Sequence, residues 1–300
     1  MNMNDKILIT GGTGMVGKHL QKILPEAVYV GSNIDLRDWI TVDALFNKLR
    51  PTRVIHLAAR VGGIQENIEK QAEFFTDNIL MNTHVLKASK QYDVQRFTGI
   101  LSTCIYPDKV DNYPMTEEDL YLGPPTETNF SYGYSKRCLA VQIEAYNKQY
   151  GTSYNYLTPC NLYSEFDNFD NEKKMHFVTA LLNKIKNANK TLNMLGTGKP
   201  LRQFMYANDL ARVIKEVVDN DIVESFNVAP NFNYTIDEMV NKTLNVLNKN
   251  LIVEYDRPEL DGQYRKDVSS EKMLSVLPNF EFTQFENGVE SVWEKITKEH

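Results

Sequence analysis

A short glycine-rich segment near the start of the chain constrains its fold more than any other feature. In ILITGGTGMVGKHL, Gly11, Gly14 and Gly17 are spaced as G-x-x-G-x-x-G between an apolar run and an amphipathic stretch. Glycine permits a tight turn and close approach of the backbone to a pyrophosphate, and a helix that follows offers unpaired N–H groups to the anion. A strand before the turn and a helix after it predict a dinucleotide-binding unit, whereas without that context the glycines would indicate only a turn.

Strand-like and helix-like segments alternate along the first half of the chain. Short apolar or β-branched runs predict strands, and the longer stretches between them carry a helical pattern. Because right-handed crossovers leave few other arrangements, this alternation predicts a doubly wound α/β fold with a parallel sheet covered by helices on both faces. We expect strands at 6–10, 27–31, 53–59, 96–103 and 153–159, and helices at 15–24, 38–49, 71–92 and 131–149.

The pattern loosens after residue 164. A polar stretch at 164–174 predicts a loop, 175–189 has the pattern of an amphipathic helix, and 196–211 predicts a loop that leads through a short strand into a helix. The run 225–230 is typical of a further strand of the same sheet. We therefore expect two interleaved domains. A Rossmann domain would comprise 1–165 and about 215–231, and a smaller C-terminal substrate-binding domain about 166–214 and 232–300.

Composition excludes several classes of protein. With 300 residues, 42% of them hydrophobic, the chain can bury a sizeable core. Its 39 acidic and 33 basic residues give a net charge of −6, so there is no basic surplus for binding nucleic acid. Three scattered cysteines are too few for a disulfide framework or a four-ligand zinc site, so we expect no metal and a reducing compartment. The sequence has no signal-peptide pattern and no long apolar run, so we expect a cytoplasmic protein with no membrane partner.

The end of the second predicted strand distinguishes between two dinucleotides. An NAD site would place an acidic residue there for the ribose 2′-hydroxyl, but the sequence VYVGSN has Ser32 and Asn33. Because nothing acidic at this point repels a 2′-phosphate, NADP(H) is the expected cofactor. Asp35 and Leu36 fit a loop that packs on the adenine, although Asp35 could equally be a helix N-cap residue.

Tyr132 and Lys136 lie one turn apart on the helix predicted at 131–149. An ammonium group beside a tyrosine lowers the pKa of the hydroxyl, so that it can exchange a proton with a substrate oxygen, and the lysine can also hold a cofactor ribose. Ser102, at a strand end, would donate a hydrogen bond to the carbonyl that is reduced. An isolated pair of this kind is more often a surface contact, but the glycine turn and the strand-end serine favour a reductase site. Tyr134 points away from Lys136 on a helix and is not the expected acid.

These motifs resemble the extended short-chain dehydrogenase/reductase family, a group that acts largely on nucleotide sugars. Segments from nearly the whole chain narrow the resemblance to its GDP-L-fucose synthase branch: AARVGGI (58–64), LSTCIYPDK (101–109), GPPTETNFSYGYSKR (123–137), NLYSEFDNF (161–169) and GTGKPLRQFMYANDLA (196–211). The resemblance implies NADPH-dependent conversion of GDP-4-keto-6-deoxy-D-mannose to GDP-L-fucose, by epimerisation at C3 and C5 and then reduction at C4. It also implies a homodimer whose four-helix interface contains the helices at 71–92 and 131–149.

By the same resemblance, Cys104 and His176 would be the acid/base pair of the epimerisation. The chemistry agrees with the residue types, because protons α to a ketone are acidic enough for a thiolate or an imidazole to remove. Taken alone, Cys104 could be a small buried hydrophobic residue and His176 a surface histidine. Cys104 stands two positions from Ser102, on the same face of extended chain, which favours a functional role.

The resemblance also implies binding residues. For the charged ones, a solvated surface position is the alternative. The expected substrate-binding residues are Lys184, Leu195, Arg202, Asp261 and Lys266. The expected cofactor-binding residues are Gly11, Gly12, Thr13, Gly14, Met15, Val16, Gly17, Asp35, Leu36, Ala58, Ile100, Leu101, Thr103, Pro159, Asn161 and Leu162.

The chain departs from the family pattern at several positions. Ser164, Glu165 and Phe166 stand where the family commonly has Gly-Pro-His, Leu195 replaces a tryptophan, and Thr179 replaces a proline. Two other functions therefore stay open. One is a C4 reductase, with or without epimerisation, for another GDP-4-keto sugar such as a deoxyheptose or colitose precursor. The other is a non-catalytic NADP-sensing protein, against which the retained serine, tyrosine and lysine of the reductase site argue.

Overall fold

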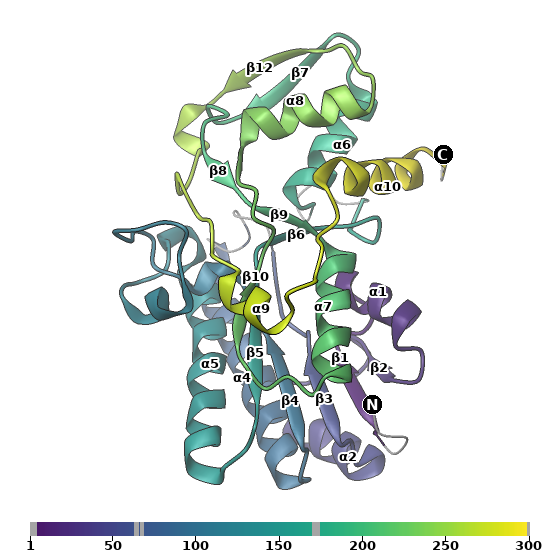
Figure 1. Cartoon of the computed structure of the whole chain (residues 1–300), viewed down its shortest axis with the longest axis vertical. Helices are drawn as coiled ribbons and strands as arrows, with labels where there is room; N and C mark the ends of the chain where they lie inside the picture. Colours follow the sequence, from purple (N-terminus) through teal and green to yellow (C-terminus); the bar gives the residue numbers. More distant parts are fainter. Residues whose placement is uncertain (1–4, 63–65, 67–68, 170–174, 299–300) are drawn as a thin grey trace.

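A six-stranded parallel sheet forms the lower part of the molecule in the computed structural model, which describes residues 5–62, 66, 69–169 and 175–298 (Figure 1). The segments 58–64 and 164–174 discussed above lie partly outside these ranges. The strand order is β10-β5-β4-β3-β1-β2. Every strand and helix expected from the sequence for this sheet is present, which confirms the doubly wound fold. The strands are β1 (Ile7–Thr10), β2 (Val28–Val30), β3 (Arg53–His56), β4 (Arg96–Ile100), β5 (Asn155–Pro159) and β10 (Phe226–Val228).

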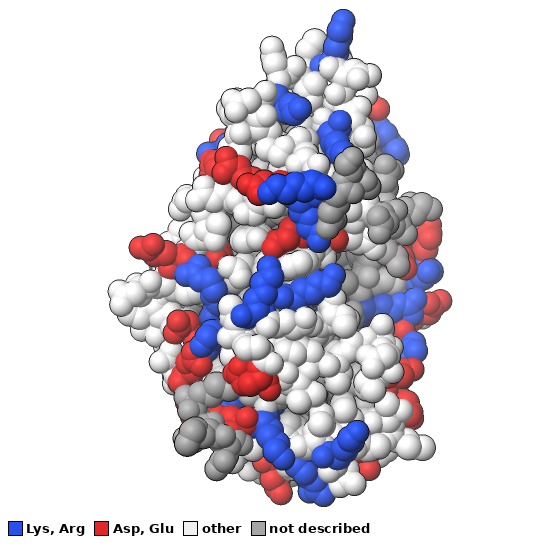
Figure 2. Space-filling view, turned by 90° about the vertical axis from the view of Figure 1, so that its right-hand side faces the viewer, with Lys and Arg blue, Asp and Glu red and all other residues white. Residues whose placement is uncertain are grey.

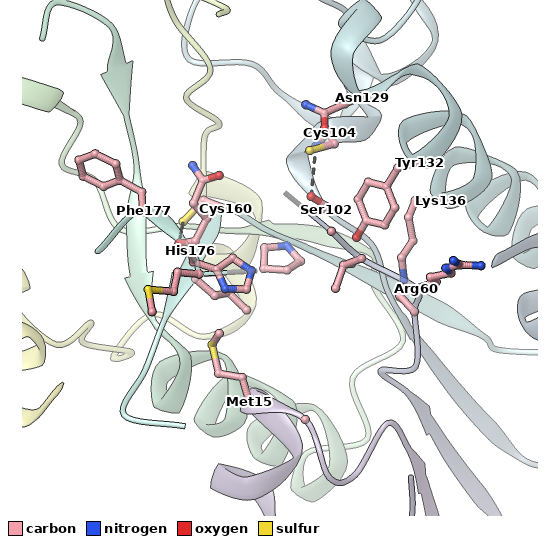
Figure 3. Close-up of a pocket in the computed structure, with 18 of the residues that line it drawn as sticks. Met15, Arg60, Ser102, Cys104, Asn129, Tyr132, Lys136, Cys160, His176 and Phe177 are labelled. Carbon is pink, nitrogen blue, oxygen red and sulfur yellow. Dashed lines mark hydrogen bonds between the residues drawn. The ribbon is translucent and has the colours of Figure 1, made fainter. Parts of the chain in front are cut away.

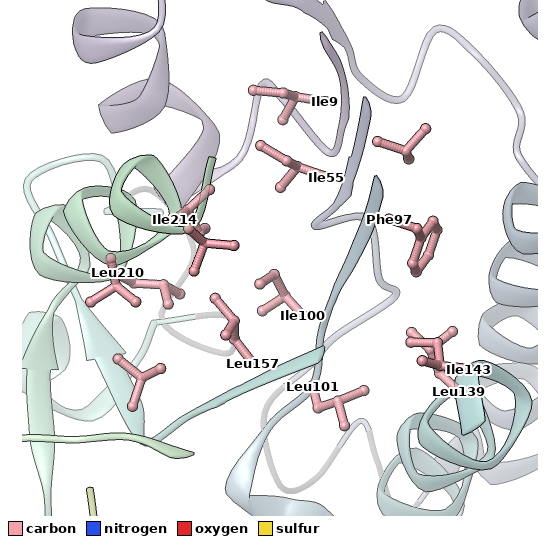
Figure 4. Close-up of a cluster of buried hydrophobic side chains, with 14 of the residues drawn as sticks. Ile9, Ile55, Phe97, Ile100, Leu101, Leu139, Ile143, Leu157, Leu210 and Ile214 are labelled. Atoms are coloured by element: carbon pink, nitrogen blue, oxygen red, sulfur yellow. The ribbon is translucent and has the colours of Figure 1, made fainter. Parts of the chain in front are cut away.

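Helices cover both faces of the sheet (Figure 1). On one face, α4 (Gln71–Gln91) packs along α5 (Phe130–Tyr150), and α2 (Trp39–Leu49) also contacts α4. On the other face, α1 (Met15–Ile23) packs along α7 (Ala207–Asp219). Figure 4 shows both sides of this core, with Leu210 and Ile214 of α7 on one side of the strands and Leu139 and Ile143 of α5 on the other.

Burial on both faces explains why the strands are apolar along their whole length. All four residues of β1, for example, are buried, and a fully buried aliphatic side chain contributes about 1.5–3 kcal/mol relative to an exposed one. Several polar side chains in this core are hydrogen-bonded to one another. The ring of His56 lies between Thr10 Oγ1 at 2.7 Å and Asn82 Oδ1 at 3.0 Å, and Asn82 donates to the Ser135 carbonyl at 3.3 Å. This chain of contacts ties β1 and β3 to α4 and α5.

The start of α2 corrects one expectation. Its N-cap is Asp38, whose carboxylate accepts hydrogen bonds from the backbone N–H groups of Ile40 and Thr41. Asp35 instead pairs with Arg37, with 2.9 Å between Arg37 Nε and Asp35 Oδ1. The interpretation of Asp35 as a helix cap is therefore wrong, because Asp38 is the residue placed to satisfy the free N–H groups of the first turn.

Two segments of the chain, here called the first and second excursions, lie outside the sheet, and β10 joins the sheet between them. The first excursion begins with β6 (Asn161–Tyr163), which pairs with β9 (Phe204–Tyr206), and between these strands lie α6 (Phe177–Asn187), β7 (Thr191–Leu195) and β8 (Leu201–Arg202). After α7 and β10 have joined the sheet, the second excursion contains β11 (Tyr234–Thr235), α8 (Ile236–Val246) and β12 (Ile252–Asp256).

The two excursions pack on each other at the top of Figure 1. β11 pairs with β8, β12 pairs with β7, and α10 (Phe285–Lys298) contacts α8 and α6. The short helix α9 (Glu271–Val276) contacts β10 at the edge of the sheet. We use the term upper part for α6, β7, β8, β11, α8, β12 and α10 together.

The charged side chains on the surface are of both signs. On the face drawn in Figure 2, lysines and arginines gather in a band across the middle of the molecule, with acidic side chains among them. Among the described residues, none of the helices has the combination of length and apolar composition that crossing a membrane requires.

Gly17 has no room for a side chain. A Cβ added there would lie 2.3 Å from the carbonyl oxygen of Gly12, at the buried contact between α1 and the glycine turn. We expect Gly17→Ala to lower the free energy of unfolding by about 1–3 kcal/mol, as overpacking does, measured by urea denaturation. Gly123→Ala is the matched control, because its Cβ would meet only Pro107, at 3.4 Å. An equal loss in the two variants would contradict this expectation.

Candidate active site

A cavity of about 1680 Å³ lies at the carboxyl ends of the sheet strands, beneath the upper part. It is lined by all five side chains that the sequence predicts to be catalytic, namely Ser102, Cys104, Tyr132, Lys136 and His176 (Figure 3). In Figure 3 the serine, cysteine, tyrosine and lysine lie on one side, and the histidine lies on the other. The structure therefore brings together residues from both parts of the molecule.

Nearly all the expected binding residues line the same cavity, and the exceptions are Gly12 and Thr103. Gly12 is buried, and a Cβ there would meet the ring of Tyr29 at 2.7–2.8 Å. Thr103 is only 2% exposed, within the short 3-10 helix η1 (Thr103–Ile105). Both residues are packed into the protein instead of lining the cavity, and their role in cofactor binding stays a prediction.

The glycine turn has the geometry that a pyrophosphate needs. Gly11 has a φ of +70°, and a Cβ there would lie 2.7 Å from the backbone nitrogen of Ala58. Gly14 is the N-cap of α1, where no side chain caps the helix and no acidic residue stands in the first turn. The free N–H groups and the positive end of the helix dipole therefore face the cavity, and an anion fits there.

After β2, the negative charge of Asp35 is balanced by an arginine. Hydrogen bonds from Arg37 hold the pKa of Asp35 at about 2, so the carboxylate is charged and paired with a guanidinium. Arg37 and Arg60 both bind Asp77, at 3.2 and 2.6 Å, and all four residues line the cavity. Neither arginine could be assigned to the cavity from the sequence, because their shared partner Asp77 lies on α4, far from both in the chain.

Lys136 is buried beneath the floor of the cavity. Its Nζ donates to the carbonyl oxygen of Ile100 at 2.7 Å, and burial lowers its pKa to about 8. The neighbouring His56 stays neutral, because burial first and the charge of Lys136 second lower the pKa of His56 to about 3. The lysine is thus held at the end of β4 by a backbone carbonyl.

The electrostatics of Tyr132 differ from the expectation. The sequence predicts that Lys136 lowers the pKa of the tyrosine, but burial first, and the charge of Cys104 second, raise it, against a smaller opposite effect of the Ser102 hydroxyl. Tyr132 is therefore protonated at neutral pH, as a proton donor must be. Tyr134 packs edge-on against Phe130, with 4.7 Å between ring centroids, in agreement with its rejection.

Cys104 meets a lysine from a distant part of the chain. The Nζ of Lys266 donates to the sulfur at 3.0 Å, and the backbone N–H of Cys104 donates to Ser102 Oγ at 3.3 Å. Burial alone would raise the pKa of the Cys104 thiol, but Lys266, Ser102 and Arg202 outweigh it and hold the pKa below its ordinary value. The other thiols, Cys138 and Cys160, have raised pKa values because of burial.

His176 is the N-cap of α6 and is fixed by Asp167. Its Nδ1 lies 2.9 Å from Asp167 Oδ1, and its backbone N–H donates to Asp167 Oδ2 at 3.2 Å. Thr179 also donates to this carboxylate, at 2.5 Å. Burial alone would lower the pKa of His176, but the hydrogen bond and the charge of Asp167 raise it above its ordinary value. Asp167 was not among the residues expected at the site, and its place in the motif NLYSEFDNF is the one signal that the sequence offers for it.

The remaining expected substrate residues border the cavity on the side of the upper part. Arg202 donates to the carbonyl oxygens of Leu201 and Asp261, and Lys184 donates to that of Asn193. The Asp261 carboxylate accepts two hydrogen bonds of 2.6 Å from Thr197, so it fixes the loop at 196–198. Leu195, at the end of β7, is 53% exposed. Cations and an exposed apolar side chain therefore border the same space.

Comparisons with known proteins agree with this geometry. GDP-L-fucose synthase of Dictyostelium discoideum is 36% identical, over 94% of this chain and 92% of that protein. GDP-L-colitose synthase of Yersinia pseudotuberculosis is 31% identical, over 88% of this chain and 89% of that protein. The crystal structure of a GDP-L-fucose synthetase from Naegleria fowleri bound to NADP has a TM-score of 0.90 and 33% identity, and the match covers 99% of this chain and 94% of that chain.

A family model gives the broader assignment. The model described as the NAD dependent epimerase/dehydratase family matches residues 7–229. This range contains the glycine turn, the six strands of the sheet and the five expected catalytic residues. The chain therefore belongs to the NAD dependent epimerase/dehydratase family.

Proposed function

We propose that this chain is an NADPH-dependent enzyme that converts GDP-4-keto-6-deoxy-D-mannose to GDP-L-fucose, by epimerisation at C3 and C5 followed by reduction at C4. The observation that carries the proposal is that one cavity holds two sets of reactive side chains. Ser102, Tyr132 and Lys136 form a reductase site, and Cys104 and His176 face the same space from two sides. Similarity to the Dictyostelium and Naegleria proteins supports the same substrate.

The reduction uses the residues at the end of β4 and the start of α5. The glycine turn and the N-terminus of α1 would hold the pyrophosphate of NADPH, and Lys136 would hold its ribose. When bound, NADPH supplies the hydride that reduces the C4 ketone. Ser102 orients the ketone oxygen through its hydroxyl, and the protonated Tyr132 donates a proton to that oxygen.

The epimerisation uses the two residues on opposite sides of the cavity. Cys104 removes a proton from the carbon next to the ketone, and the electron pair of the broken C–H bond moves into the enolate. His176, whose protonated form Asp167 favours by raising its pKa, returns a proton to the other face of the same carbon. Inversion requires a donor on the face opposite the base, which two residues from different parts of the fold can supply.

Cationic side chains at the edge of the cavity would bind the diphosphate of the GDP moiety. Arg202 and Lys184 both border it, and a guanidinium can bind two phosphate oxygens at once. Because the protein has a net charge of −6, such local cations are what a diphosphate requires. A free, reactive Cys104 also requires a reducing compartment, and we propose the cytoplasm.

A C4 reductase for another GDP-4-keto sugar is the second candidate. The observation that favours it is Leu195, which is exposed in the cavity at the position where the family commonly has a tryptophan. Similarity to the Yersinia GDP-L-colitose synthase agrees with a related sugar. Deuterium uptake from the solvent distinguishes the candidates, because only the first requires exchange at both C3 and C5.

We also propose that the protein is a homodimer formed through α4 and α5. The two helices lie side by side over 21 residues each. Their outer surface leaves large apolar side chains exposed, among them Phe75, Leu80, Val141 and Tyr150. A second copy of the same pair would cover these side chains in a four-helix bundle, and a two-fold interface needs only one surface that matches itself.

The two sets of residues should be separable by mutation. With GDP-4-keto-6-deoxy-D-mannose and NADPH in deuterated water, we expect the wild type to oxidise NADPH and to label C3 and C5. Tyr132→Phe should slow NADPH oxidation by about 10²–10⁴-fold, the usual contribution of a general acid, and still label the sugar. Cys104→Ser should lose labelling and still bind NADPH. NADPH oxidation by the wild type without label at either carbon would overturn the epimerase half of the proposal.

The Asp167 carboxylate should set the pH range of epimerisation. Because it raises the pKa of His176, its loss lowers that pKa, and the imidazolium then disappears at a lower pH. We expect Asp167→Asn to move the high-pH limb of the labelling rate downwards by about 1–3 pH units. Thr179→Val is the control, because it removes only one hydrogen bond to Asp167. If the high-pH limb of the labelling rate stays unchanged in Asp167→Asn, this role of Asp167 is contradicted.

The dimer should be sensitive to charge on α5. Val141 is 50% exposed, and we expect Val141→Asp to yield monomers in sedimentation velocity, because a dimer would bury the new carboxylate without a partner. Val223 is 41% exposed and lies outside α4 and α5, so Val223→Asp should leave the dimer intact. A monomeric wild type, or dissociation of both variants, would contradict the proposed interface.

A further inference from the structure

The contact between Lys266 and Cys104 is more specific than a general cation at the edge of a binding site. Lys266 Nζ lies 3.0 Å from Cys104 Sγ, across 162 positions of sequence, and the lysine is only 9% exposed. We propose that Lys266 is a positioning residue that holds Cys104 as a thiolate before the sugar binds, and so makes Cys104 the group that removes the first proton. The inference rests on the proposed epimerisation, which it deepens.

A buried ammonium group requires a partner that bears or can bear a negative charge. The neighbouring carboxylate of Asp267 is already bound by Arg265, through hydrogen bonds of 2.6 and 2.9 Å. Within the part of the chain that the structure describes, the ammonium of Lys266 hydrogen-bonds to the sulfur of Cys104. The thiolate is therefore the anion that the geometry offers to this lysine.

The other groups around the sulfur agree with a negative charge there. Arg202, from the first excursion, acts on Cys104 through its positive charge, and Ser102 Oγ accepts the backbone N–H of Cys104 at 3.3 Å. Tyr132, from α5, is a further titratable group, whose pKa the charge of Cys104 helps to raise, and it is protonated. Two cations and the Ser102 hydroxyl thus act on the sulfur. Together they outweigh burial, which alone would raise the pKa of the thiol.

The proton transfer balances without any change in the charge of the lysine. The C–H bond next to the ketone breaks, the proton forms an S–H bond with Cys104, and the electron pair moves into the enolate. Lys266 keeps its proton throughout and stays beside a neutral thiol. Lys266 thus acts through Cys104, by increasing the fraction of the thiol that is ionised when the sugar arrives.

The alternative role for Lys266 is direct binding of the sugar or its diphosphate. Such a role would raise KM when the lysine is removed and would leave the ionisation of Cys104 unchanged. The two roles are therefore separated by the pH at which the thiol ionises, and this quantity can be measured without substrate.

The experiment measures the rate at which iodoacetamide alkylates each cysteine of the full-length protein from pH 6 to 10, by peptide mass spectrometry. In the wild type, the midpoint for Cys104 should lie below about 8.5, the value of a free thiol, and below that of Cys138. Lys266→Met should raise the midpoint by about 1–3 pH units, and Lys266→Arg should bring it back towards the wild-type value. Lys184→Met is the matched control, since Lys184 borders the same cavity and hydrogen-bonds to the Asn193 carbonyl.

A Cys104 midpoint in the wild type at or above that of a free thiol would overturn the proposal, and this result does not depend on whether a variant folds. An unchanged midpoint in Lys266→Met, or an equal shift in Lys184→Met, would also overturn it. With substrate, the low-pH limb of deuterium labelling should move upwards by the same amount as the alkylation midpoint. A higher KM with an unmoved limb would assign Lys266 to binding instead.

Failure of the proposed function gives a different result. If the wild type labels neither C3 nor C5, the proton-removing role of Cys104 is overturned whatever the variants do. The alkylation midpoints then still show whether Lys266 controls the ionisation of the thiol, because no sugar is present in that measurement.

Discussion

The parallel arrangement of the central sheet is the constraint on which the rest of the structure depends. Because all six strands run in the same direction, their carboxyl ends meet at one edge, and each chain segment that follows a strand begins there. The glycine turn after β1, Ser102 after β4 and Asn161 after β5 are therefore neighbours around one cavity. Helices must return the chain to the opposite edge after each strand, which requires both faces of the sheet to be apolar.

The upper part is built from the two segments that extend beyond this edge after β5 and β10, before the chain returns to the sheet or ends. His176 and Arg202 come from the first excursion, and Lys266 comes from the segment that follows the second. The excursions pack on each other through the β7–β12 and β8–β11 pairs, and this packing supports the segments that carry these residues. A doubly wound sheet alone would contain the proposed reductase residues, whereas the proposed epimerisation pair requires both parts.

The parts of the fold and of the site that could be predicted from the sequence are those that depend on residues close together in the chain. The glycine turn, the alternating strands and helices, and the spacing of Tyr132 and Lys136 depend on residues close together in the chain, and the structure contains all of them. Partners from distant segments leave no such signal. The pairing of Lys266 with Cys104, and the burial that raises the pKa of Tyr132, are products of tertiary packing.

The residues that depart from the family pattern also make contacts with distant parts of the chain, which the structure shows. Ser164 Oγ lies 2.8 Å from Nε2 of the buried His19 on α1, and Glu165 accepts a hydrogen bond of 2.6 Å from Tyr206. These contacts join the loop after β6 to α1 and β9. Thr179, at a position where proline is usual, donates to the carboxylate that holds His176. The sequence marks these residues as unusual, but only the structure shows that they support the same loop and the same histidine.

The charges in the cavity connect the two reactions that we propose for it. Lys266 favours the anionic form of Cys104, and Asp167 favours the cationic form of His176, so one side is prepared to accept a proton and the other to donate one. Burial, the larger cause, and the negative charge of Cys104 both raise the pKa of Tyr132, so the tyrosine carries its proton while Cys104 is ionised. The proposed base of the first reaction and the proposed acid of the second therefore stand in one cavity in the protonation states that their reactions require.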